Sequence, residues 1–116
     1  MQKEGCIFCG IVGGYIPGDI ILRTERAIAI RDVNPQAPLH FLIIPREHIE
    51  NTMELYSEKM ITLGDIFQLI SSLANSYGVD ERGYRVVMNV GEDGGQTVDH
   101  LHFHFLAGRR MYWPPG

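Results

Sequence analysis

Cysteine, tryptophan and long apolar runs are scarce in this sequence. It has two cysteines and one tryptophan among 116 residues. Cys6 and Cys9 are too close along the chain for a structural disulfide, and in a reducing compartment they would be thiols. The first residues lack the apolar core of a signal peptide, and no segment approaches the roughly 18 apolar residues that a membrane helix needs. We therefore expect a cytoplasmic protein with no membrane partner.

The sequence also lacks an excess or a run of positive charge. Ten Lys and Arg residues against fourteen Asp and Glu residues give a formal net charge of -4. Binding to duplex nucleic acid requires a basic surface that neutralises phosphates. We therefore expect no nucleic-acid partner, although a site for one small anion remains compatible because local geometry decides its affinity.

The hydrophobic content is sufficient for a folded core. It amounts to 45% of residues, which argues against disorder. The length suits one domain, and we find no repeat or linker, so we expect a single domain over residues 1–116. A domain of this size is only marginally stable alone, and pairing of two copies would bury further apolar surface.

The periodicity of apolar residues predicts one long helix and about five strands. Apolar residues recur every three or four positions over 57–77, with Ser57 as N-cap and Gly78 just after the end. A short helical turn is expected over 8–13, and strands over 20–22, 26–31, 41–44, 84–90 and 98–106. The last two strands would form a hairpin around a glycine-rich turn. The predicted fold is α+β, a mostly antiparallel five-stranded sheet carrying one long helix.

Three histidines alternate along the last predicted strand. Because alternate side chains of a strand share a face, His100, His102 and His104 are expected to lie on one face while the residues between them enter the core. Such a face favours either a metal site, since His-x-His binds zinc, or catalysis by imidazole. An inert surface is the third alternative.

The turn before this strand favours a phosphate ligand. Its glycines allow backbone N–H groups to approach an anion closely, and Gln96 and Thr97 add side-chain donors. An ordinary glycine hairpin turn is an equally good interpretation of this segment alone. Beside the histidines, however, the turn suits a phosphate better than a catalytic metal.

The segment 100–106 resembles the His-φ-His-φ-His-φ-φ signature of the histidine triad family, where φ is apolar. The resemblance extends to Phe8 and to the segments 32–40, 42–45, 83–85 and 94–96. The tail, with Gly108-Arg109-Arg110 and Trp113-Pro114-Pro115-Gly116, is similar to the purine-nucleotide phosphoramidase branch. These motifs cover nearly the whole chain.

The resemblance implies catalytic roles for four residues. His102 stands at the position of the nucleophile that attacks the α-phosphorus and forms a nucleotidyl-histidine. His104 would bind the phosphate, Thr97 would serve the leaving amine where serine is usual, and His40 would lie near the nucleophile as a supporting group.

The resemblance also implies a nucleotide site. Asp32 would accept hydrogen bonds from both ribose hydroxyls. The phosphate and sugar would meet Asn89, Gly95 and Gln96, and the base would lie among the apolar side chains of Phe8, Ile11, Val33 and Ile44. For these four apolar residues, plain core packing is at least as good an interpretation.

A homodimer is implied as well, with two sheets joined into one through the long helix and the last-but-one strand. Trp113 would then approach the neighbouring subunit's site. The helix itself carries Met60, Ile61 and Ile66 around its main apolar stripe, more apolar surface than one sheet covers.

Cys6-x-x-Cys9 suggests either redox chemistry or zinc. A redox pair calls for a thioredoxin-like context, which is absent. Similarity to bacterial triad proteins with a structural zinc implies His48 and His100 as the remaining ligands of a closed tetrahedral site that bears no chemistry. Two unmodified buried thiols are the alternative. We expect no organic cofactor.

The leading functional hypothesis is hydrolysis of purine nucleoside 5′-phosphoramidates or aminoacyl-adenylates to the nucleoside monophosphate. Three alternatives remain open: a dinucleoside polyphosphate hydrolase, a non-catalytic nucleotide-binding or interaction protein, and a zinc hydrolase that uses the triad as ligands.

Overall fold

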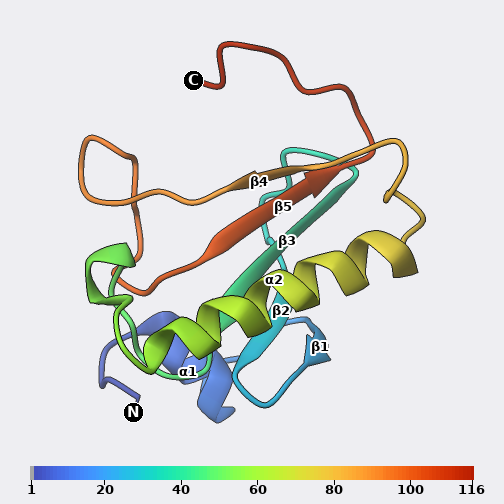
Figure 1. The fold of residues 1–116 in the computed structure, drawn as a ribbon. Helices are drawn as coiled ribbons and strands as arrows, with labels where there is room; N and C mark the ends of the chain where they lie inside the picture. The colour runs from blue at the N-terminus through green and yellow to red at the C-terminus, as the bar shows by residue number, and fades with distance from the viewer. Residues whose placement is uncertain (1) are drawn as a thin grey trace.

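The protein is a five-stranded sheet with a helix on each face (Figure 1). The computed structural model describes residues 2–116. The elements in chain order are α1 Ile7–Gly13, β1 Ile20–Arg23, β2 Ala27–Arg31, β3 Leu39–Pro45, the single 3-10 turn η1 Thr52–Glu54, α2 Lys59–Ser76, β4 Arg85–Val87 and β5 Phe103–Ala107. This α+β fold confirms the prediction. None of the helices within residues 2–116 is long and apolar enough to cross a bilayer.

The strands are antiparallel and lie in the order β1-β2-β3-β5-β4. β3 is the central strand, and its continuous apolar run is buried on both faces, as that run predicted. β4 lies at one edge and pairs only with β5. In the β3–β5 register, Leu42 is opposite His104 and His40 is opposite Leu106.

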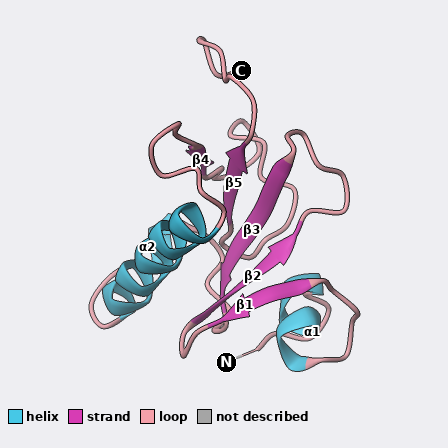
Figure 2. Cartoon of the chain, turned by 90° about the vertical axis from the view of Figure 1, so that its right-hand side faces the viewer, coloured by secondary structure: helices cyan, strands magenta, loops and turns pink. Residues whose placement is uncertain are grey.

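Alternation along the strands creates two cores. On one face, Phe41, Ile43 and Phe105 pack with the buried side of α2. On the other face, Leu42 and Ile44 pack with residues of α1. Figure 2 shows α2 and α1 on opposite sides of the sheet. β5, which contains His104, lies inside the sheet between β3 and β4.

The long helix differs in detail from the prediction. It begins at Lys59, because Ser57 has a left-handed backbone conformation, φ 55°, and Glu58 is the N-cap residue. Gly78 does adopt the left-handed conformation expected after the helix end. The buried stripe is centred on Ile66, which is fully buried rather than marginal, whereas Phe67 is 48% exposed.

The predicted hairpin is much shorter than expected. β4 and β5 cover three and five residues, so 88–102 forms a long connection. The cause is tertiary, because the segment before β5 bonds to the loop after β3 instead of to β4. The N–H of Leu101 donates to the carbonyl of Ile49, and the amide of Gln96 donates to the carbonyl of Glu50.

Candidate active site and metal centre

The triad histidines gather on the α1 side of the sheet, although only His104 lies within β5. The ring of Phe8 from α1 is edge-on to His100 and His102, with ring centroids 5.8 and 5.2 Å apart. The rings of His102 and His104 are 5.2 Å apart. Leu101 and Phe103, which alternate with the histidines, belong to the core beneath α2.

His102 is held in one tautomer by the main chain. Its side chain is buried, with 5% exposed, and its Nδ1 lies 2.7 Å from the carbonyl oxygen of His100. Since a carbonyl only accepts, Nδ1 carries the proton and donates it. In this tautomer the lone pair is on Nε2, where a nucleophile or a general base requires it.

A second chain of hydrogen bonds fixes the tautomers of His40 and His104. The backbone N–H of Gln36 donates to Nδ1 of His40 at 3.0 Å. The proton of neutral His40 is therefore on Nε2, which donates to Nδ1 of His104 at 2.9 Å. His104 in turn carries its proton on Nε2. This ring presents an N–H donor suited to a phosphate oxygen.

Burial keeps these two imidazoles neutral. It lowers the pKa of His104 to about 4, with the neighbouring histidines as a further cause. Burial also lowers the pKa of His40, partly offset by the carboxylate of Asp32, whose Oδ2 lies 3.4 Å from Nε2. The other oxygen of Asp32 accepts the N–H of Asn34 at 2.8 Å. The chain of donors is therefore intact at neutral pH.

Two cysteines and two histidines form a compact cluster next to the triad. Nδ1 of His100 lies 3.2 Å from Sγ of Cys6 and 3.5 Å from Sγ of Cys9, and Nδ1 of His48 lies 3.3 Å from Sγ of Cys9. Burial raises the pKa of the Cys9 thiol and lowers that of His100 to about 4. Without a cation, these two groups are therefore neutral.

The same four residues fit a metal ion. Their ligand atoms all lie within 4.8 Å of one another, and ligands of a tetrahedral zinc are roughly 3.5 Å apart for S and N. Nε2 of His100 donates to the carbonyl of Pro45 at 2.9 Å, which turns Nδ1 toward the sulfurs. The cluster could hold a metal ion, and thiolate and imidazole ligands are compatible with zinc.

Part of the hydrogen bonding of the glycine-rich turn is internal. The N–H groups of Gly95 and Gln96 donate to the carbonyls of Glu92 and Gly91. The side-chain amide of Gln96 accepts the N–H of Gly91 and donates to the carbonyls of Glu50 and Val98. Gln96 therefore shapes this turn in the structure. Thr97 is exposed and lines a cavity of about 340 Å³ with Cys6 and His48.

The residues expected around the base divide into two groups. Phe8, Ile11 and Ile44 belong to the core beneath α1, so packing alone accounts for them. Val33 is 101% exposed beside Asp32, and packing does not account for it. Asn89 is half-buried in the connection after β4.

The tail extends away from the sheet, as Figure 1 shows. Trp113 is 82% exposed there. The carbonyl of the neighbouring residue Tyr112 accepts a hydrogen bond from Arg85 at 3.0 Å, which ties the tail to β4.

Two backbone groups central to this site have no signal in the sequence. The N–H of Gln36 sets the tautomer of His40, and the carbonyl of Pro45 orients His100. Every residue offers such groups, so only the folded chain identifies them. The alternation of His100, His102 and His104 was the signal for the side chains.

Comparisons with known proteins give one consistent result. Residues 14–111 match the model of the HIT domain. A HIT-like protein of Synechococcus elongatus is 45% identical over 115 residues, covering 99% of this chain and 100% of the relative. A HIT family hydrolase from Legionella pneumophila superposes with a TM-score of 0.93 at 43% identity, covering 97% of this chain and 100% of that one. A histidine triad nucleotide-binding protein from Candida albicans gives 0.82 at 32% identity, covering 95% and 83%.

Proposed function

The chain belongs to the HIT domain family, and from this premise we propose that it is a nucleotide-binding hydrolase with His102 as its nucleophile. Its substrates would be purine nucleoside 5′-phosphoramidates or aminoacyl-adenylates, cleaved at the P–N or acyl-phosphate bond. The solved relatives include a HIT family hydrolase and a histidine triad nucleotide-binding protein. The observation that carries the proposal is the hydrogen bond from Nδ1 of His102 to the His100 carbonyl.

In the first step, the lone pair on Nε2 of His102 attacks the α-phosphorus. A bond forms between phosphorus and Nε2, and the bond from phosphorus to the leaving group breaks with its electron pair. A carboxylate leaves as the anion. An amine nitrogen instead takes a proton from solvent, relayed by the hydroxyl of Thr97. The positive charge that results is spread over the imidazole ring of His102, and the carbonyl oxygen that accepts its Nδ1–H stabilises it.

In the second step, water attacks the same phosphorus. The P–N bond to His102 breaks, its electron pair returns to Nε2, and the water proton passes to solvent. The product is the nucleoside monophosphate. Throughout, the Nε2–H of His104 would donate to a phosphate oxygen, and His40 would hold His104 in that tautomer.

Asp32 and Val33 would recognise the nucleoside. The carboxylate of Asp32 would accept the ribose hydroxyls, which disfavours deoxynucleotides. The exposure of Val33 next to it supports contact with a base at this position. Phe8, Ile11 and Ile44 would form the buried wall behind the base. Asn89, Gly95 and Gln96 would approach the phosphate and sugar.

Zinc is the metal we propose for Cys6, Cys9, His48 and His100. A four-ligand site has no open position for water, so the ion would stabilise the fold and supply no chemistry to the reaction. These residues would fasten α1 to the loop after β3 and to the segment before β5. Phe8, which contacts His102, lies within the fastened helix.

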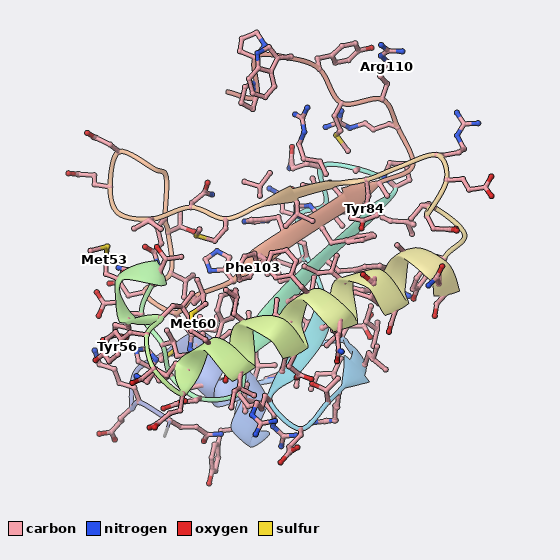
Figure 3. The ribbon with its side chains drawn as sticks, viewed as in Figure 1. Met53, Tyr56, Met60, Tyr84, Phe103 and Arg110 are labelled. Carbon is pink, nitrogen blue, oxygen red and sulfur yellow. The ribbon has the colours of Figure 1, made fainter. Side chains whose placement is uncertain are left out.

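A homodimer would form through α2 and the free edge of β4. Met60, Ile61 and Phe67 are exposed on α2, and Tyr84 is exposed at the start of β4. Figure 3 shows Met60 and Tyr84 on the same side of the molecule. Pairing of two β4 edges would satisfy open backbone groups and cover this apolar surface. Trp113 would then reach the partner's site.

Turnover of a fluorogenic tryptamine phosphoramidate tests the function, with adenosine and guanosine substrates compared. We expect wild-type hydrolysis and its loss in His102→Ala. Binding of nucleotide without turnover would instead identify a non-catalytic binding protein. Faster cleavage of a dinucleoside polyphosphate would identify that class of hydrolase, and immediate loss of activity with a chelator would favour a metallohydrolase.

A further inference from the structure

A cavity lined by three arginines lies away from the histidines. It has a volume of about 470 Å³ and is formed where the loop after α2 meets the start of the tail. Its lining residues are Val79, Arg82, Gly83, Gly108, Arg109 and Arg110. β5 separates it from His102, and five strand residues span roughly 16 Å. Arg110 is labelled in Figure 3 beyond the end of β5.

None of the three arginines of this cavity forms an ion pair with a carboxylate within residues 2–116. Among residues 2–116, the arginine ion pairs are Arg26 with Glu25 and Arg31 with Asp19. Asp80 and Glu81 precede Arg82 in the chain, but neither lines the cavity. Three guanidinium groups around one cavity repel each other unless an anion lies between them. This local excess of positive charge contrasts with the net charge of the chain, which is -4.

The backbone and one guanidinium are fixed in advance of any ligand. Nε of Arg109 donates to the carbonyl of Gln36 at 2.9 Å, and its Nη1 donates to the carbonyl of Arg110 at 3.0 Å. Three of the five N–H groups of Arg109 remain available. Gly108 has φ +96°, and a Cβ there would come within 2.9 Å of Pro38. Glycine thus lets the tail turn closely against the 34–38 loop and bring Arg109 and Arg110 beside Arg82.

We propose that this cavity is a second anion site, separate from the triad, that binds a small ligand with at least two phosphate groups. Planar guanidinium groups bind phosphate through paired N–H donors. The volume lies in the range of small-ligand sites. The inference concerns a different surface from the proposed active site and does not depend on the hydrolase activity.

Titration of ¹⁵N-labelled full-length protein with inorganic pyrophosphate tests the site. We expect saturable shifts at the backbone amides of Gly83 and Gly108 and at the Arg109 Nε–H, weaker in high salt. Arg82→Gln and Arg110→Gln should each raise the Kd at least about ten-fold, as expected for loss of a charge-assisted hydrogen bond. The matched control is Arg23→Gln, an exposed arginine on β1 at the opposite sheet edge, which should leave the Kd unchanged.

Several outcomes would overturn the assignment. Shifts confined to the amides of His102 and His104 would mean that pyrophosphate binds only at the triad. Unchanged affinity in Arg82→Gln and Arg110→Gln, or an equal loss in Arg23→Gln, would show a non-specific charge effect. Equal binding of citrate would refute the preference for phosphate. None of these readouts involves turnover, so failure here and failure of the proposed hydrolase activity are distinguishable.

Discussion

Acidification should destabilise the protein through the buried pair His40 and His104. The pKa of His104 is lowered by burial from 6.5 to about 4 in the folded chain. Between these pH values the unfolded chain binds more protons than the folded chain. The contribution of the neutral His104 to the free energy of unfolding is therefore fully present above pH 6.5 and is lost as the pH falls toward 4. At pH 4.5 the unfolded imidazole is almost fully protonated and the folded one mostly neutral, a loss of about 2–3 kcal/mol relative to pH 7.5.

This loss is large compared with the stability of a small domain, which is about 5–15 kcal/mol. With a urea dependence of about 1–2 kcal/mol per M, the unfolding midpoint should fall by roughly 1–3 M between pH 7.5 and pH 4.5. The substitution His104→Gln removes the buried imidazole. The urea midpoint of this variant should therefore change less than that of the wild type between the two pH values. Because His40 donates to His104, the difference measured belongs to the pair.

The comparison of wild type with His104→Gln separates this effect from other acid-sensitive groups. The cysteine–histidine cluster is present in both proteins and contributes equally to both pH dependences. If wild type and His104→Gln lose the same stability on acidification, the buried neutral imidazole is not the cause. The tautomer chain from Gln36 to His104 would then need revision.

The remaining predictions concern the nucleophile, the metal and the dimer. His102→Ala should lose at least about a thousand-fold in kcat while still binding nucleotide by calorimetry, and retention of more than about 1% of kcat would contradict covalent catalysis. Metal analysis should find about one zinc per chain, and Cys6→Ser with Cys9→Ser should remove it and lower Tm by several degrees with kcat within a few-fold; a metal-free wild type would refute the site. Sedimentation should give about twice the 13.1 kDa chain mass, and Phe67→Glu should yield a monomer, whereas a wild-type monomer would contradict the interface.

Periodicity predicted the elements whose structure depends on burial alone. The apolar run 41–44 was expected to be a strand buried on both faces, and β3 has this property. A helix over 57–77 was expected from its three- and four-residue spacing, and α2 occupies most of that range. In both elements, the tertiary contacts favour the same secondary structure as the local pattern of apolar residues.

The expectations that were wrong depended on contacts between distant segments. Residues 98–102 alternate like a strand, but the N–H of Leu101 donates to the carbonyl of Ile49 in the loop after β3, and β5 begins only at Phe103. Ser57 is a good N-cap by type, yet its left-handed backbone excludes it from the helix start. The site shows the same division. Alternation indicated that the histidine side chains lie together, whereas the backbone partners of His40 and His100 had no signal in the sequence.

His100 belongs to both centres but contributes different atoms to each. Its ring faces the thiols, while its carbonyl oxygen holds Nδ1 of His102. A carbonyl is supplied by any residue, so a substitution at this position would remove one ligand of the proposed metal site and still leave an acceptor for Nδ1 of His102. A single substitution of His100 should therefore disrupt the proposed metal site and preserve the tautomer of His102, provided that the backbone at residue 100 keeps its conformation. The reverse change cannot be made in this way. No side-chain substitution at residue 100 removes the carbonyl acceptor and keeps the cysteine–histidine cluster intact.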